Sequence, residues 1–370
     1  MKAFRITRPL RSLLIAAAGA GMLASCSTLN YYTQAAQGQL SLLSDARSVD
    51  DWLADPATNP KLRHRLETAR QIRRFAVYEL GLPDNDSYKT YASLKRPYVL
   101  WNIVATPELS LKPMTWCFPV AGCVNYRGYY SKVDAQAYAR ELRAEGMDVE
   151  VGGVPAYSTL GWFSDPLVST FINYPDAELA RLIFHELAHQ VVYVPGDSQF
   201  NESFASAVEE VGVERWLDRF GTAAIREAYD KYSARKHDFL ALLLKHRKEL
   251  ERTYAAPVSD ADKRARKALV FKALKDEYQL LKASWGGYAG YDKFFAEPLS
   301  NAHLASIATY SDFVPAFRAL LKRERNASSF YKSVRQIADL DRADRHKVLR
   351  NLGAPMPELP VLQRTMGASR

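Results

Sequence analysis

Residues 182–190 read Leu-Ile-Phe-His-Glu-Leu-Ala-His-Gln, and this stretch places two histidines four residues apart in an apolar run. The apolar residues recur at helical spacing, which predicts a buried α-helix. Side chains four residues apart share one face of a helix, so the imidazoles of His185 and His189 can reach one metal ion. We expect Asp176 to cap the start of this helix and residues 194–197, Val-Pro-Gly-Asp, to end it.

Glu186 follows the first histidine and completes the pattern H-E-x-x-H. In this pattern a zinc ion polarises a water molecule, and the glutamate accepts its proton and later delivers it to the leaving amine. A purely structural zinc helix would need the histidines but not this carboxylate. The pattern therefore predicts one Zn²⁺ ion bound by His185 and His189, with Glu186 as the general base.

A third protein ligand is needed, and Glu202 stands 13 residues after His189 at the start of the next predicted helix. If the two helices run antiparallel about a turn near Gly196, Glu202 lies level with His189. Glu209 competes for this role, but it lies about a turn beyond the metal and is expected to orient a histidine ring instead. The alternative that Glu202 only caps its helix would leave a buried histidine pair without a partner.

The H-E-x-x-H motif at 185–189, followed by Asn201-Glu202-x-x-Ala205, resembles the gluzincin branch of zinc metallopeptidases. More closely, the chain resembles the predicted-aminopeptidase family of bacterial lipoproteins. The resemblance implies a zincin-like active-site helix pair and hydrolysis of a peptide substrate. It also draws on segments spread over nearly the whole chain, which are residues 23–26 (LASC), 31–39 (YYTQAAQGQ), 116–123 (WCFPVAGC) and 308–317 (ATYSDFVPAF).

Two departures from the gluzincin pattern bear on specificity. The interval between His189 and Glu202 is shorter than is usual in gluzincins, whereas Glu209 keeps the longer interval without the Asn-Glu context. The Gly-x-Met-Glu-Asn segment that recognises a free amino terminus in one gluzincin aminopeptidase family is absent. The sequence therefore leaves open whether the protein is an exopeptidase or an endopeptidase.

Substrate alignment and oxyanion stabilisation have several candidates. Residues 151–157, VGGVPAY, either form an edge strand that binds a peptide backbone or make a turn at Gly152-Gly153. Zincins often add a Tyr or His to stabilise the oxyanion, and Tyr310, His303 and Tyr157 are the candidates here. The remaining histidines fall on charged helical stretches and are interpreted as solvated surface residues: His64, His237, His246 and His346.

The N-terminal segment predicts export and lipidation. Residues 1–25 combine four basic residues, an apolar run of about 12 residues and no acid, which is typical of a signal peptide and short for a membrane span. Leu23-Ala24-Ser25-Cys26 resembles a lipobox, so we expect cleavage before Cys26 and a lipid on its thiol. By resemblance to Gram-negative lipoproteins, Ser27 after this cysteine, in place of Asp, suggests the outer membrane, facing the periplasm.

The net charge and the cysteines predict one excluded class of partner and one disulfide. The formal net charge of +9 falls to about +5 once the four basic residues of the signal are removed, and no basic block remains, so nucleic acid is not an expected partner. Cys117 and Cys123 are expected to pair in the oxidising periplasm. A metal pair is the alternative, although no His or second Cys pair stands near them in the sequence.

The elements expected along the chain predict an α+β fold that is mostly α. We expect a single domain over 26–370, with a small α/β lobe at about 40–160 and a helical lobe at about 170–355. The predicted helices are 60–80, 134–144, 222–254 and 260–285, the last two forming an antiparallel hairpin, and the predicted strands are 98–104 and 149–154.

These observations predict a lipid-anchored, periplasmic zinc metallopeptidase with Glu186 as general base. The alternative is an envelope lipoprotein that keeps the zinc but turns over weakly or not at all and acts as a binding or scaffolding module.

Overall fold

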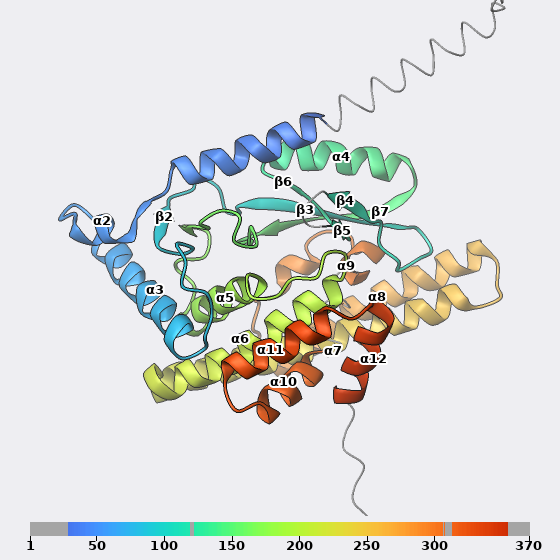
Figure 1. The fold of residues 1–370 in the computed structure, drawn as a ribbon. Helices are drawn as coiled ribbons and strands as arrows, with labels where there is room; N and C mark the ends of the chain where they lie inside the picture. The colour runs from blue at the N-terminus through green and yellow to red at the C-terminus, as the bar shows by residue number, and fades with distance from the viewer. Residues whose placement is uncertain (1–28, 119–121, 306, 308–312, 354–370) are drawn as a thin grey trace, which may run out of the picture.

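The computed structural model describes residues 29–118, 122–305, 307 and 313–353 (Figure 1). Three small sheets of two or three strands lie between residues 47 and 168, and every described element after residue 176 is helical. The prediction of an α+β fold that is mostly α is thus confirmed.

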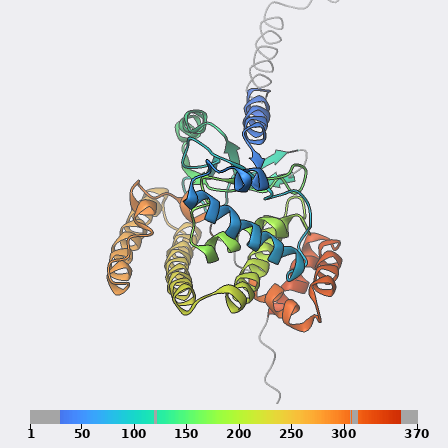
Figure 2. The same cartoon turned by 90° about the vertical axis from the view of Figure 1, so that its left-hand side faces the viewer.

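The first part of the chain combines short strands with three helices and an N-terminal helix over residues 29–44. This N-terminal helix lies beside α4 at one surface of the molecule (Figures 1 and 2). The elements in this part are β1 (Arg47–Ser48), α2 (Val49–Ala54), α3 (Pro60–Tyr78), β2 (Thr90–Ala92), β3 (Leu100–Pro107), β4 (Trp116–Phe118), β5 (Gly122–Val124), β6 (Arg127–Tyr129), α4 (Lys132–Ala144), β7 (Met147–Val154) and β8 (Leu167–Val168).

The sheet that contains the longest strands has the order β6-β3-β7, and both pairs of neighbouring strands are antiparallel. β7 is an edge strand, and its pairing with β3 places Gly152 opposite Asn102 and Glu150 opposite Val104. Gly152 and Gly153 therefore lie within a strand and do not make a turn. One face of this sheet packs on α4 through a cluster that includes Trp101, Ile103 and Val149, and the side chains of the other face alternate with these.

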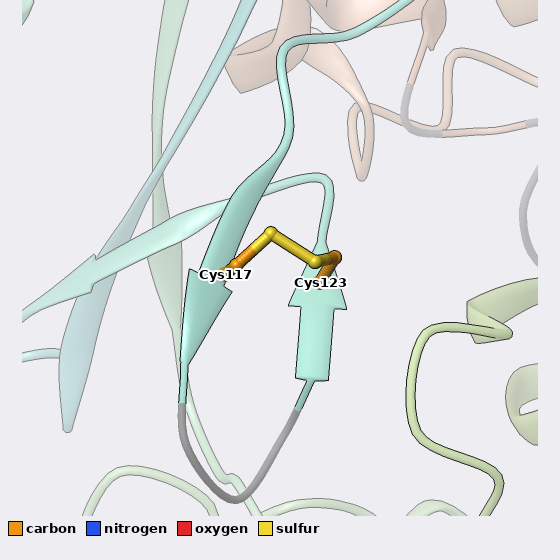
Figure 3. The surroundings of a disulfide bond; sticks show 2 residues. All are labelled: Cys117 and Cys123. Carbon is orange, nitrogen blue, oxygen red and sulfur yellow. A yellow bond between two sulfur atoms is a disulfide. The ribbon is translucent and has the colours of Figure 1, made fainter.

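The remaining two sheets are smaller. β2 pairs antiparallel with β1 and parallel with β8, so this sheet is mixed. β4 and β5 form a hairpin in which Cys117 and Cys123 lie opposite each other and are joined by a disulfide (Figure 3). The expected pairing of these cysteines is therefore seen. A Cβ atom at Gly122 would come within 2.9 Å of the backbone nitrogen of Gly196, so this hairpin lies against the turn between α5 and α6.

The second part of the chain is a set of helices packed beneath the sheets (Figure 1). Two long helices, α7 and α8, pack against each other as a hairpin, as predicted, over a separate apolar cluster that includes Phe239 and Tyr278. The elements in this part are α5 (Asp176–His189), α6 (Ser198–Phe220), α7 (Ala223–Ala255), α8 (Asp260–Ser284), the 3-10 helix η1 (Asp292–Phe295), α9 (Asn301–Ala305), α10 (Val314–Arg323), α11 (Ala327–Ala338) and α12 (Arg342–Gly353).

The main apolar core surrounds α5. Leu179, Ile183 and Leu187 on this helix are fully buried, and the same cluster includes residues of α3, α6, α10 and α11. Because nearly every face of α5 is covered, the two histidines lie on a helix with little freedom to move.

The helix termini correct one expectation. Asp176 does not cap α5, because the cap position is Pro175, which has no side-chain hydrogen bond. The Asp176 carboxylate pairs with Arg65 of α3 instead. At α6 the capping side chain is Asp197, whose Oδ1 accepts a hydrogen bond of 3.3 Å from the Phe200 N–H. Glu202 is therefore not the cap of its helix.

None of the helices in the described part of the chain is both long and apolar enough to cross a membrane.

Candidate metal centre

The site lies where α5 and α6 pack side by side. Residues of α5 near its end contact the start of α6, while Phe184 contacts the later residue Gly212, so the two helices run antiparallel. A Cβ atom at Gly212 would come within 2.7 Å of the Phe184 ring and 2.8 Å of Leu80. Gly212 therefore permits the close approach of the two helices.

His185, His189 and Glu202, the ligands proposed from the sequence, lie together at this helix pair. The Nε2 atom of His185 is 3.2 Å from the Nε2 atom of His189 and 3.2 Å from Oε2 of Glu202. The Nε2 atom of His189 is 3.7 Å from Oε1 of Glu202. These are the side chains of the described chain that could together hold a metal ion, with donor atoms within 4.8 Å of one another.

The donor set fits a zinc ion. Zinc binds imidazole nitrogen and carboxylate oxygen at about 2.0–2.2 Å, and two donors of a tetrahedral site at that distance are roughly 3.3 Å apart. The 3.2 Å and 3.7 Å separations between the donors match this spacing. Three protein donors also leave one tetrahedral position open, which is the arrangement of catalytic zinc sites.

Glu209 lies on the other side of the His185 ring. Its Oε2 atom is 2.8 Å from Nδ1 of His185, and both of its oxygens accept hydrogen bonds from Arg181, at 3.2 and 3.3 Å. Arg181 in turn bonds Glu178 at 2.8 Å. A proton on Nδ1 that is donated to Glu209 leaves the lone pair of Nε2 directed toward His189 and Glu202.

Electrostatics differ between the two histidines. Burial alone would lower the pKa of His185, but the carboxylates of Glu209 and Glu202 outweigh this effect and raise its pKa. No carboxylate of the described chain bonds the Nδ1 atom of His189, and burial lowers the pKa of this residue. Its Nδ1 atom is buried and makes no hydrogen bond within the described part of the chain.

Glu186 is half-buried and has mostly acidic neighbours. Burial raises its pKa to about 7, and the carboxylates of Glu202 and Asp165 act in the same direction, whereas His185 opposes them. Tyr88, whose side chain is fully enclosed, adopts a positive φ of 63° and donates its backbone N–H to the Asp165 carbonyl at 2.6 Å. A carboxylate with a pKa near 7 can take up and release a proton at neutral pH.

Two cavities border the candidate metal ligands. One, of about 160 Å³, is lined by Glu202 and by residues of β3 and β7, including Glu150. The other, of about 440 Å³, is lined by His189, Tyr193 and the loop that carries Trp162, whose side chain is 70% exposed.

Sequence reasoning missed two tyrosines near this group. Tyr126, which is 40% exposed, lines the same cavity as Glu202, and burial followed by the charge of Glu202 raises the pKa of Tyr193. Tyr193 lies four residues after His189, a spacing visible in the sequence, and its ring packs edge-on against the His189 ring. Tyr126 follows the disulfide hairpin, and no local pattern links it to α5.

The predicted oxyanion candidates have other surroundings. The Tyr157 hydroxyl hydrogen-bonds Tyr130 and Gln39. His303 lies on α9, where its Nδ1 is 3.1 Å from the Ser300 nitrogen. Tyr310 falls outside the described residues, as do Cys26 and the signal peptide.

The interpretation of four histidines as solvated holds for two of them. His64 and His237 are exposed. The interpretation is wrong for His246, which is only 4% exposed and lies beside Glu277. His346 is also wrong, because its Nε2 lies 2.9 Å from the buried Asp197 carboxylate, which also pairs with Arg345. Both lie on helices with many charged residues, and the sequence of such a helix does not show which of its residues are buried by a distant partner.

Comparison with known proteins agrees with the peptidase interpretation. A family model described as "Putative aminopeptidase" matches residues 30–349. No curated protein and no solved structure shows a significant match to the chain. The match spans most of the chain and includes every residue of the candidate centre, so the protein belongs to this aminopeptidase family.

Proposed function

We propose that the protein is a zinc-dependent peptidase in which His185, His189 and Glu202 bind one Zn²⁺ ion. The observation that carries this proposal is the convergence of three zinc-type donors on one point, with separations of 3.2 to 3.7 Å, beside the half-buried Glu186. Membership of an aminopeptidase family supports peptide hydrolysis as the reaction. Zinc bound there would supply a Lewis acid that polarises a water molecule and the substrate carbonyl.

Glu186 would act as the general base and then as the general acid. Its carboxylate accepts a proton from the attacking water, and it passes this proton to the nitrogen of the leaving amine as the peptide bond breaks. Glu186, which follows His185 on α5, is the carboxylate proposed for both steps, and it changes its protonation state twice in each turnover.

The phenols of Tyr126 and Tyr193 would act on the substrate carbonyl. Tyr126 lines the same cavity as Glu202, and each phenol can donate a hydrogen bond to oxygen as negative charge develops on it. Tyr193 also lines the cavity next to His189.

We also propose that the protein is anchored in the bacterial envelope by a lipid on Cys26, at the outer membrane and facing the periplasm. The support comes from the lipobox-like residues 23–26, the signal-like residues before them and Ser27. A disulfide between Cys117 and Cys123 suits an oxidising compartment. A Cys26→Ser variant should lose fatty-acid labelling, and labelling at the wild-type level would refute the anchor.

Zinc removal and return would test the proposed reaction. The full chain, purified in detergent, is stripped with a chelator and titrated with Zn²⁺ while hydrolysis of a mixed peptide library is followed by mass spectrometry. We expect activity to vanish on stripping and to return with one equivalent of zinc. Full zinc occupancy without hydrolysis of any peptide would instead favour a binding or scaffolding role, and activity that survives stripping would exclude zinc.

A further inference from the structure

The 440 Å³ cavity beside His189 has a largely apolar wall. Five of the residues that line it are apolar or aromatic, and no Lys, Arg, Asp or Glu of the described chain lines it. The five are Leu160, Trp162, Val191, Tyr193 and Pro195, and the other two lining residues are His189 and Gln190. A charged side chain would find no opposite charge among these residues, so the cavity is suited to an uncharged, apolar group.

Trp162 lines this cavity without being packed into the protein. It is 70% exposed, and the neighbouring Phe163 is 47% exposed. Neither ring belongs to the three apolar clusters of the described chain. Covering a large aromatic ring with an apolar group is favourable, so an exposed tryptophan in a cavity wall favours an apolar ligand.

Hydrogen bonds hold the loop that carries Trp162 in one conformation. Asp165, which is 3% exposed, accepts hydrogen bonds from the backbone N–H of Thr159 at 2.9 Å and from its hydroxyl at 2.7 Å. The Thr159 hydroxyl oxygen accepts the Phe163 N–H at 3.1 Å, and the Thr159 carbonyl accepts the Trp162 N–H at 3.1 Å. Trp162 is therefore presented by a closed turn whose backbone is tied at both ends.

The same turn contains backbone strain. Leu160 has a φ of 57° and Gly161 a φ of 81°, and both values lie in the left-handed region. Glycine adopts this region freely, whereas leucine is disfavoured there by its Cβ atom. Such strain persists only where the surrounding structure fixes the backbone, and it is concentrated at sites that bind ligands.

The turn also packs against the helix that carries the candidate metal ligands. A Cβ atom at Gly161 would lie 3.8 Å from Oε1 of Gln190, the residue that follows His189. This Oε1 atom accepts a hydrogen bond of 2.6 Å from the Asn85 side chain, so the Gln190 side chain is itself held in place. The fold therefore sets the position of the turn relative to His189.

We propose that this cavity binds a large apolar side chain of a residue that flanks the scissile bond of a peptide substrate. The inference rests on the proposed function, and it specifies the substrates as peptides with Phe, Leu or Trp beside the cleaved bond. His189 in the cavity wall supports this placement, because a side chain bound there lies next to the candidate metal ligands. Trp162 would cover the bound side chain and thereby determine specificity.

A positional peptide series separates this proposal from the peptidase assignment. The zinc-loaded full chain is assayed on hexapeptides that carry Phe, Ala or Lys at each position in turn, and mass spectrometry locates the cleaved bond. We expect kcat/KM to be ~10- to 100-fold higher with Phe than with Ala or Lys at one position beside that bond, as burial of one aromatic side chain allows. Equal values for the three residues at both flanking positions would overturn the proposal and leave the peptidase function intact.

Truncation of Trp162 tests the residue itself. Trp162→Ala should reduce the preference for Phe over Ala by ~10-fold and keep the wild-type melting temperature, because the ring is exposed. Trp162→Phe keeps an aromatic ring and should retain most of the preference. The matched control is Leu280→Ala, which truncates a 73% exposed apolar residue of α8 and should behave as wild type. An unchanged preference in Trp162→Ala would contradict the proposal.

Binding provides a readout that does not depend on turnover. Calorimetry on the zinc-free Glu186→Gln full chain should show ~10-fold tighter binding of Ala-Ala-Phe-Phe-Ala-Ala than of Ala-Ala-Lys-Lys-Ala-Ala, and Trp162→Ala in the same background should remove most of the difference. Equal binding of the two peptides, or binding of neither, would show that the cavity does not receive an apolar side chain. Tighter binding of the Phe peptide without any wild-type hydrolysis would refute the peptidase function while the apolar site stands.

Discussion

The Nδ1 atom of His185 lies 2.8 Å from Oε2 of Glu209, and the opposite ring nitrogen lies 3.2 Å from Nε2 of His189. Glu209 also accepts a hydrogen bond from Arg181. The Glu209 carboxylate and the Arg181 guanidinium together therefore hold the His185 ring on its Nδ1 side. Such partners of a metal-binding histidine set its tautomer and orientation.

Removal of this support should weaken zinc binding without abolishing it. Glu209→Gln should lower zinc affinity by ~10- to 100-fold, because the His185 ring loses the acceptor that orients it. The measurement is a competition titration with a chromophoric chelator. Glu210→Gln is the matched control, since Glu210 faces Arg318 and not the site. Loss of all zinc in Glu209→Gln beside full zinc in Glu202→Gln would make Glu209 the third ligand.

The Asp197 carboxylate should hold the start of α6 in place. It is 1% exposed and pairs with Arg345 at 2.5 Å. Asp197→Asn leaves Arg345 buried without its partner and should lower the free energy of unfolding by about 3–5 kcal/mol. Asp344→Asn, on an exposed residue of the same helix as Arg345, is the control for urea denaturation. Equal midpoints for the two variants would argue against this role.

The same pair predicts a dependence of stability on pH. Burial would raise the pKa of Asp197, but hydrogen bonds from His346 and Arg345 outweigh it and lower the pKa. Because the folded pKa lies below the unfolded value of about 3.9, the stabilisation is complete above that value and is lost as the pH falls through the folded pKa. From about pH 5 downward, wild type should lose more stability than Asp197→Asn, and parallel losses would refute the linkage.

Substitution by alanine should have different effects on stability at the two adjacent glycines of β7. Gly153→Ala displaces the Tyr98 ring and should lower stability by ~1–3 kcal/mol. Gly152→Ala meets no close atom and should keep the wild-type melting temperature, while peptide hydrolysis falls because the methyl group enters the cavity. Each variant serves as the control of the other. Full activity in a stable Gly152→Ala protein would place the substrate elsewhere.

The disulfide should stabilise the hairpin that packs on the turn between α5 and α6. Closing a loop of this length is expected to contribute about 2 kcal/mol, so replacing Cys117 and Cys123 with serine should cost about that much. Urea denaturation with and without dithiothreitol measures the effect, which should be absent in the double variant. Equal stability of oxidised and reduced wild type would show that the bond does not contribute.

Local spacing could predict that His185, His189 and Glu202 lie close together because all three are on two consecutive helices. His185 and His189 are one helical turn apart, and a count across a short turn brings Glu202 level with them. The same reasoning failed for the Asp176 cap, since Arg65, more than a hundred residues earlier in the chain, binds that carboxylate. A tertiary ion pair of this kind leaves no local signal.

Residues from the strands could not be predicted in the same way. Glu150 reaches the site only because β7 pairs with β3 in one register, and a shift by one residue would turn its side chain toward α4. The position of Tyr126 in the cavity wall depends on where the disulfide hairpin packs against the turn at Gly196. His246 and His346 sit on charged helices, and only the packing of distant partners buries them.

The most direct test of the zinc peptidase mechanism is to measure zinc content and peptide hydrolysis together in the Glu186→Gln full chain. Glutamine keeps the shape of the side chain but cannot accept the proton of water, so zinc should stay at one equivalent while turnover falls by at least ~100-fold. His189→Ala, measured beside it, should lose both. Wild-type turnover in a zinc-replete Glu186→Gln protein would contradict the account.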